Sequence, residues 1–205
     1  MRNFCPALLA LLLLGAASPT TTRSVRPRTP STARPAPRAI TRVETPPAPD
    51  SAQVIALLEG VAHPTCPLPG VATGGQIGAE HVAALRRSGF RTVLDLRGLD
   101  EARGFPEADS VRGAGIDYVS IPVTQASLGD STFEAVRAVM QDAKRYPILV
   151  HCRTGSRVGV MLMPWLVLDR GWVLERAEST AVAAGMHGPM RDSALDYITR
   201  HTARR

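Results

Sequence analysis

The segment from Ile148 to Arg157 constrains the fold more than any other part of the sequence. It opens with Ile148-Leu149-Val150, a short and wholly apolar run of the kind that lies in the middle of a covered parallel sheet. Residues 151–157 follow, with a glycine at position 155, and a second segment of helical length then runs from Val158 to Arg170. This order predicts a buried strand, a tight loop and a helix in direct succession.

Strand-like and helix-like segments alternate through the rest of residues 51–205, and after the loop three helical segments follow one another. Such an order predicts an α/β domain with a central, mostly parallel sheet flanked by helices and a helical C-terminal part. The expected strands are 71–75, 91–96, 116–121 and 148–150, and the expected helices are 77–87, 100–114 with an interruption near Gly104 and Pro106, 132–145 with Ser131 as N-cap and Glu134 completing a capping box, 158–170, 174–184 and 189–201.

The predicted loop places a cysteine at the start of a helix. The first turn of a helix presents unpaired N–H groups and a partial positive charge, which together bind oxyanions such as phosphate or sulfate. Gly155 lets the backbone fold tightly because it carries no Cβ atom. This setting favours the thiolate form of Cys152, and we therefore expect Cys152 to be a nucleophile.

The other residues of the loop are expected to bind the anion or to support the loop. Arg157 is expected to be catalytic, since its guanidinium can bind two oxygens of a bound anion at once. His151 is expected to hydrogen-bond the loop rather than to transfer protons. The expected substrate-binding residues are Arg153, which has solvent exposure as its alternative, Thr154, Gly155 and Ser156.

Asp95 and Arg97 lie at the end of the strand predicted over 91–96, so they are expected at the sheet edge that carries the loop, where open α/β sheets bind ligands. Arg97 and Glu101 are interpreted as supporting residues that hydrogen-bond the loop from behind. The alternative is that the two form an ion pair on the surface.

The residues His151, Cys152 and Gly155, spaced as His-Cys-x-x-Gly, resemble the opening of the tyrosine and dual-specificity phosphatase signature. The Cys-Arg-Thr-Gly-Ser-Arg loop is more similar to the beta-lactamase-hydrolase-like phosphatase-like family, a bacterial branch of that superfamily. The resemblance spans about Gly70 to Met186 and includes the segments 89–97 and 115–123. It implies a dual-specificity-phosphatase-like fold and hydrolysis of a phosphoester through a thiophosphate intermediate on Cys152.

Two departures from the phosphatase pattern leave alternatives open. Four residues instead of five separate Cys152 from Arg157, which is the loop length of rhodanese-like sulfurtransferases, and a smaller cradle suits a persulfide on the cysteine. The family's general acid is also missing from 123–127. The nearest carboxylate is Asp130, a candidate general acid whose alternative role is to start a helix. Sulfur transfer, and a non-catalytic module that binds anions or partners, therefore remain alternatives.

Cysteine and histidine residues outside the loop suggest two further arrangements. Cys66 could pair with Cys152 if the protein is exported, because a disulfide persists in an oxidising compartment; otherwise Cys66 is a small residue in a turn. His63, Cys66, His151 and Cys152 could form a four-ligand metal set, but a metal on Cys152 would block the nucleophile. We therefore expect no metal and no cofactor.

The N-terminal residues predict an exported protein. Arg2 and the apolar run 7–14 are typical of a signal peptide, assigned to 1–17, which is too short for a permanent membrane span. Residues 18–50 contain eight prolines and six arginines and are predicted to be a disordered linker. Residues 51–205 remain as the catalytic domain, with a periplasmic or extracellular location.

The net charge of +6 belongs mainly to the N-terminal residues. The linker contributes +4 and Arg2 contributes +1, which leaves +1 for the catalytic domain and argues against nucleic acid as a partner. The basic linker has the charge for weak association with a membrane or wall polymer, and the alternative is a solvated linker. The expected partner is a small phosphorylated or sulfur-donor substrate or a phosphoprotein. The sequence does not indicate an oligomeric state.

Overall fold

The computed structural model describes residues 49–203. The predicted signal peptide 1–17, and all but the last two residues of the predicted linker 18–50, lie outside the described residues. Helix α1 (Ser51–Leu57) begins where the catalytic domain was predicted to start, while the domain boundaries themselves stay a prediction. Within residues 49–203, no helix combines the length and the apolar character needed to cross a membrane.

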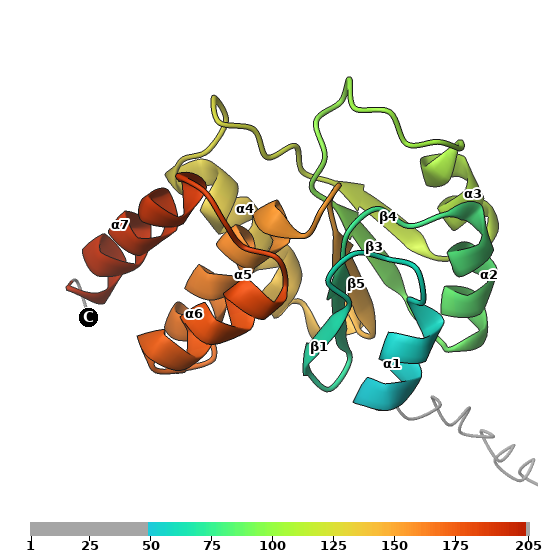
Figure 1. The fold of residues 1–205 in the computed structure, drawn as a ribbon, viewed down its shortest axis with the longest axis horizontal. Coiled ribbons are helices and arrows are strands. Elements are labelled where there is room, and N and C mark those ends of the chain that lie inside the picture. The colour runs from blue at the N-terminus through green and yellow to red at the C-terminus, as the bar shows by residue number, and fades with distance from the viewer. Residues whose placement is uncertain (1–48, 204–205) are drawn as a thin grey trace, which may run out of the picture. The chain divides into compact units, whose positions relative to one another are not determined.

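A five-stranded sheet forms the centre of the domain (Figure 1), in the order β1-β2-β5-β3-β4. The strands are β1 (Thr65–Leu68), β2 (Val71–Gly74), β3 (Thr92–Asp95), β4 (Asp117–Ser120) and β5 (Ile148–His151). Only the β1–β2 pair is antiparallel. The wholly apolar strand β5 lies in the middle of the sheet, and the predicted α/β class with a mostly parallel sheet is confirmed.

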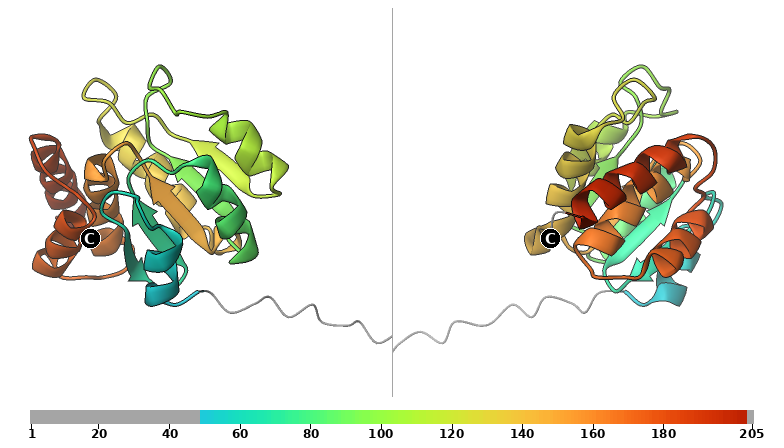
Figure 2. Two further views of the ribbon diagram at one scale, coloured as in Figure 1. Left: turned by 45° about the vertical axis from the view of Figure 1, so that its right-hand side comes forward. Right: turned by 90° about the vertical axis from the view of Figure 1, so that its left-hand side faces the viewer.

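Helices cover both faces of the sheet, as Figures 1 and 2 show. Helices α1, α2 (Ala79–Arg87) and α3 (Glu107–Gly113) pack on one face. Helices α4 (Asp130–Gln141) and α5 (Ser156–Leu168) pack on the other, and α6 (Leu174–Ala183) and α7 (Met190–Thr202) pack against α5. A 3₁₀ turn, η1 (Ala143–Arg145), follows α4. The helical C-terminal part is therefore present as predicted.

The sheet divides the core into two layers because successive strand residues point to opposite faces. Along β5, Ile148 and Val150 join the core beneath α4–α7, whereas Leu149 joins the core beneath α1–α3. Each of the three residues is at most 3% exposed. Strand β5 is thus held on both faces, which fixes the point where the loop after it begins.

The starts of α3 and α4 differ from the prediction. The helix expected over 100–114 is reduced to α3, because Gly104 has a φ of +77° and Pro106 takes the N-cap position. Helix α4 begins at Asp130 with Gly129 as its N-cap, so the predicted capping box of Ser131 and Glu134 is wrong. Gly129 is extended and ends the loop, and the carboxylate of Asp130, the first helical residue, binds Arg200 of α7.

Helices α5 and α6 approach too closely at Gly159 for any larger residue. A Cβ atom at this position would lie 2.6 Å from the Cβ of Met186 and would also overlap the carbonyl oxygen of Ala181. We expect Gly159→Ala to lower the free energy of unfolding by about 1–3 kcal/mol, because the two helices must separate. Urea denaturation measures the change. Gly113→Ala is the matched control, because nothing lies within 4 Å of its Cβ position. An unchanged stability of Gly159→Ala would contradict the close packing.

Candidate active site

The loop after β5 is short and tightly turned. Residues 152–155 separate His151, the last residue of β5, from Ser156, the first of α5. Gly155 adopts a φ of +91°, and a Cβ atom there would overlap the carbonyl oxygen of Ala184. This turn brings the N–H of Gly155 to 3.2 Å from the sulfur of Cys152, to which it donates. The Cys152 sulfur therefore receives a backbone hydrogen bond at the start of a 13-residue helix.

Arg157, in the first turn of α5, is oriented by a carboxylate and two carbonyl groups. Its Nη1 and Nη2 atoms bind the carboxylate of Glu101, with 2.8 Å between Nη2 and Oε2. Nη1 also lies 3.4 Å from the carbonyl oxygen of Leu96 and 3.3 Å from that of Val123. Glu101 raises the pKa of Arg157, and Arg157 in turn lowers the pKa of Glu101.

These contacts leave one edge of the Arg157 guanidinium for an anion. They use the Nη1 and Nη2 ends, whereas Nε is given no acceptor oxygen by residues 49–203. The guanidinium also interacts with the Cys152 sulfur, which contributes to its raised pKa. A guanidinium can bind two oxygens with one edge, so an oxyanion beside the sulfur would find both a cation and loop N–H groups.

Glu101 is itself fixed by the loop that carries it. Its Oε1 atom accepts a hydrogen bond from the N–H of Gly98 at 2.7 Å. Arg103 closes the same loop by donating to the carbonyl oxygens of Gly98, Leu99 and Glu101, and its Nε lies 3.2 Å from Asp95. The structure therefore brings the predicted supporting residue Glu101 into direct contact with Arg157.

Arg97, the other predicted supporting residue, lies in a buried polar network beneath the loop. It is 0% exposed, so the alternative of a surface ion pair is wrong for this residue. Its Nε and Nη2 bind the two oxygens of Asp95 at 2.8 and 2.9 Å, and Nη2 also binds Glu107. The hydroxyl of Tyr118 donates to Asp95 at 2.6 Å. No sequence feature distinguishes Glu107 from the exposed Asp109 two residues later.

The side chain of His151 belongs to this network and not to the predicted anion-binding loop 152–157. Its Nε2 lies 2.9 Å from Oε1 of Glu107, an ion-pair contact whose alignment is too poor for a hydrogen bond. Neither ring nitrogen is hydrogen-bonded within the described part of the chain. The prediction that the His151 side chain hydrogen-bonds the loop is therefore wrong. Its ring instead connects the residue before Cys152 to Glu107 on α3.

The same network contains a set of atoms that could in principle hold a metal ion. Donor atoms of Asp95, Glu107 and His151 lie within 4.8 Å of one another and are all buried. The guanidinium of Arg97 already binds both carboxylates, however, and supplies the positive charge that a cation would bring. We therefore interpret the cluster as a structural ion-pair network.

Cys66 lies on the other side of the sheet from Cys152. It is in β1 and packs against the core beneath α1–α3, whereas Cys152 is fully buried in the core beneath α4–α7. Both cysteines are free. Strand β2 lies between β1 and β5, which places β1 and β5 about 9–10 Å apart, whereas a disulfide spans only about 4.4–6.8 Å between Cα atoms. The geometry thus favours the interpretation of Cys66 as a small structural residue.

Asp130, the candidate general acid, is engaged in a different interaction. Arg200 of α7 binds both of its carboxylate oxygens at 2.7 Å. Such a pair stabilises the ionised carboxylate and so opposes its use as a proton donor. The geometry favours a role for Asp130 in joining α4 to α7, and its role as an acid stays a prediction.

The side chains of the remaining loop residues are exposed or bonded to other parts of the chain. The side chains of Arg153 and Thr154 are exposed. The carbonyl oxygen of Arg153 accepts a hydrogen bond from the N–H of Gln76, and the hydroxyl of Ser156 donates to the carbonyl oxygen of His187. Substrate binding by residues 153–156 therefore stays a prediction, for which the backbone N–H groups are the available donors.

Comparison with known proteins places these features in context. The family model described as "DSP-PTPase phosphatase fused to NAD+ Kinase" matches residues 69–195. A DUF442 protein of Shewanella putrefaciens, described as a phosphatase, has a TM-score of 0.60 at 21% identity, covering 73% of this chain and 97% of its own. Pseudomonas aeruginosa TpbA in complex with phosphotyrosine has a TM-score of 0.53 at 17% identity, and the match covers 79% of this chain and 99% of TpbA. A search of the curated proteins finds no match.

A third similar structure is the core catalytic domain of the PP-IP phosphatase SIW14 from Saccharomyces cerevisiae, solved with citrate. Its TM-score is 0.55 at 13% identity, and the match covers 70% of this chain and 93% of that domain. At these identities the likeness concerns the fold, which is that of the dual-specificity phosphatases.

The buried network makes stability depend on pH. Burial alone would raise the pKa of Asp95, but its bonds with Arg97, the nearby charge of His151 and the Tyr118 hydroxyl lower it from 3.8 to about 2. Because the folded pKa lies below the unfolded value, Asp95 contributes about 2 kcal/mol of stability above pH 4. This contribution is lost as the pH falls from about 4 towards 2. Carboxyl NMR titration should find Asp95 ionised at pH 3 and should find its pKa higher in Tyr118→Phe. A normal Asp95 titration would contradict the network.

Proposed function

Since this chain belongs to the family of DSP-PTPase phosphatase domains described as fused to NAD+ kinase, we propose that it is a cysteine-dependent phosphoester hydrolase. One observation carries the proposal. The sulfur of Cys152, the N–H of Gly155 and the guanidinium of Arg157 meet at the start of α5, with Arg157 held there by Glu101. Attack on a phosphoryl group requires a nucleophile next to fixed hydrogen-bond donors that bind the phosphoryl oxygens.

The proposed reaction has two steps. The thiolate of Cys152 attacks phosphorus, so that an S–P bond forms while the P–O bond to the leaving group breaks. Water then attacks the thiophosphate, the S–P bond breaks, and inorganic phosphate leaves with the thiolate restored. Loop N–H groups and Arg157 bind the phosphoryl oxygens in both steps.

The first step also requires the leaving oxygen to depart. With Asp130 paired to Arg200, we assign none of the described residues 49–203 as its proton donor. A leaving group of low pKa departs as the anion and takes its proton from water. Aryl phosphates are therefore expected to be better substrates than alkyl phosphates.

Sulfur transfer through a Cys152 persulfide is the second candidate function. The observation that favours it is the loop length, since Arg157 follows Cys152 after four residues instead of five. The family model, the DUF442 protein and SIW14 are described as phosphatases, and TpbA was solved with phosphotyrosine, which supports phosphoester hydrolysis over sulfur transfer and over a non-catalytic module.

The natural setting of the enzyme is also a proposal. TpbA was solved with phosphotyrosine and SIW14 is described as a PP-IP phosphatase, so either a phosphoprotein or a small phosphorylated molecule suits the cradle. The sequence pattern at 1–17 supports export to the periplasm or beyond, with the basic linker 18–50 preceding the enzyme.

The two cysteines provide a matched test of the nucleophile. We expect Cys152→Ser to lower kcat for p-nitrophenyl phosphate by at least about 1,000-fold, because the hydroxyl is a far weaker nucleophile than the thiolate. Cys66→Ser should keep the parent activity, since Cys66 packs on the opposite face of the sheet. Rapid quenching followed by mass spectrometry should find a phosphoryl group on Cys152.

Three outcomes would overturn the phosphatase proposal. The first is that the parent protein cleaves no aryl phosphate. The second is that Cys152→Ser is as active as the parent. The third is that thiosulfate treatment, and not phosphoester turnover, modifies Cys152, in which case one extra sulfur on this residue would establish the persulfide alternative.

Arg157 provides a test of the cradle itself. Arg157→Lys keeps the positive charge but loses the planar fork that binds Glu101 and an anion at the same time. We expect kcat/KM for aryl phosphates to fall by about 100- to 1,000-fold. Arg87→Lys, on the exposed surface of α2, is the control and should leave kcat/KM unchanged. Equal values for the two variants would exclude a role of the Arg157 fork.

A further inference from the structure

Gln76 contacts two parts of the candidate active site that lie far apart in the sequence. It follows the last residue of β2 by two positions, at the sheet edge where β5 also ends, because Gly74 and His151 are paired. Its backbone N–H donates to the carbonyl oxygen of Arg153 at 3.0 Å. Its side-chain amide donates to the carbonyl oxygen of Arg103, also at 3.0 Å. One residue therefore joins the loop after β5 to the loop between β3 and α3.

The backbone contact continues the pairing of β2 with β5 into the loop 152–155. The N–H of Cys152 lies 3.4 Å from the carbonyl oxygen of Gly74. The bond from Gln76 to Arg153 comes next along both segments. The approach is close, since a Cβ atom at Gly75 would lie 3.0 Å from the carbonyl oxygen of Arg153. The backbone at Gln76 is therefore held against the residue that follows Cys152.

The side-chain contact acts on the loop that carries Glu101. Arg103, whose carbonyl oxygen accepts from Gln76, folds its guanidinium back onto three carbonyl oxygens of the segment 98–101. Glu101 in turn binds Arg157. In Figures 1 and 2 this loop rises above the edge of the sheet where α5 begins. The bond from Gln76 therefore restrains the end of the loop that orients Arg157.

The two loops also meet directly, in the ion pair of Glu101 with Arg157, and this pair is partly exposed. An exposed ion pair holds its partners weakly, because water screens the charges and two long side chains lose freedom. The bond from the Gln76 amide ends on a backbone oxygen, so it restrains the main chain of the loop itself. A side chain in a site is held accurately when a further shell of hydrogen bonds supports it.

We propose that Gln76 is a positioning residue of this active site. It holds the loop 98–104 against the loop 152–155. This contact keeps Glu101 next to Arg157, so that the guanidinium stays oriented for an anion. The effect on turnover rests on the proposed phosphatase function, whereas the contact between the loops is observable without a substrate.

Two variants of nearly the same shape remove the amide donor. Gln76→Met leaves no polar group, and Gln76→Glu places a carboxylate opposite the carbonyl oxygen of Arg103. We expect both to lower kcat/KM for p-nitrophenyl phosphate at pH 7 by about 10- to 100-fold, because a small misplacement of a substrate-binding group has a large effect on rate. Gln141→Met, at the exposed end of α4, is the matched control and should keep the parent value.

The carboxyl group of Glu101 reports the same contact without a substrate. Arg157 and the N–H of Gly98 hold the pKa of Glu101 below its usual value. Carboxyl NMR titration should find this pKa raised towards the usual value in Gln76→Met, because the loop moves away from Arg157, and unchanged in Gln141→Met. A loss of stability alone would not move it, since the titration is read in the folded protein.

The positioning role is overturned if the pKa of Glu101 keeps its parent value in Gln76→Met, whether or not kcat/KM falls. It is also overturned if either Gln76 variant is as active as the parent, or if Gln141→Met lowers kcat/KM equally. A parent protein that cleaves no aryl phosphate would overturn the phosphatase proposal, and the titration would still decide whether Gln76 holds the two loops together.

Discussion

The rest of the site depends on the ion pairs that the buried guanidinium of Arg97 forms. It binds Asp95 of β3 and Glu107 of α3, and through them it reaches Tyr118 of β4 and His151 of β5. Removing one member of a buried charged pair costs about 3–5 kcal/mol, because the partner is left uncompensated. The ends of three neighbouring strands and the start of α3 are therefore fixed relative to one another.

This fixed network extends outward to the proposed nucleophile. Arg103 binds Asp95 and also closes the loop that presents Glu101, and Glu101 in turn orients Arg157 beside the Cys152 sulfur. The position of the Arg157 side chain is thus set by a series of ionic contacts that begins in the core. Such preorganisation is what makes electrostatic stabilisation of a transition state effective.

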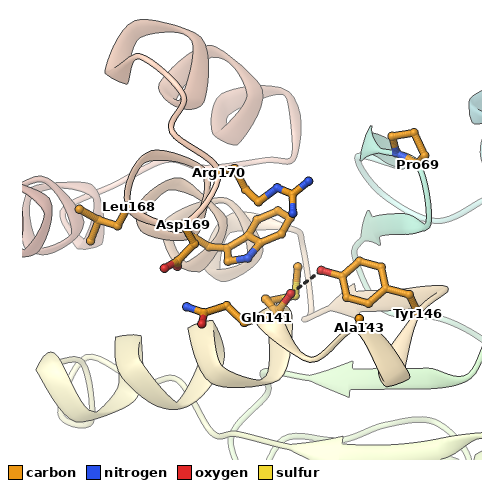
Figure 3. A pocket seen from close by; sticks show the side chains of 9 residues that line it. Pro69, Gln141, Ala143, Tyr146, Leu168, Asp169 and Arg170 are labelled. Carbon is orange, nitrogen blue, oxygen red and sulfur yellow. Dashed lines mark hydrogen bonds between the residues drawn. The ribbon is translucent and has the colours of Figure 1, made fainter.

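Apolar packing fixes the positions of Cys152 and of the start of α5. Strand β5 is buried on both faces and delivers Cys152 to one place, while close contacts at Gly155 and Gly159 hold the start of α5 against α6 and the residues that follow it. At their other ends, the same strand and helix border a pocket lined by Tyr146 and Arg170 (Figure 3). One strand–helix unit therefore carries the loop of the proposed nucleophile at one end and this pocket at the other.

The sequence alone determined the strand–loop–helix unit and the class of fold, because a buried strand, a Cys152–Arg157 loop and helical periodicity are local patterns. It also indicated Arg97 and Glu101, since both follow a strand at the edge where the loop lies. It could not identify Glu107, place His151 in the ion network, or reveal that Asp130 pairs with Arg200, 70 residues away. Those facts depend on which charged groups meet across separate elements, and only the tertiary structure decides them, because a buried charge must find its partner in space and not along the chain.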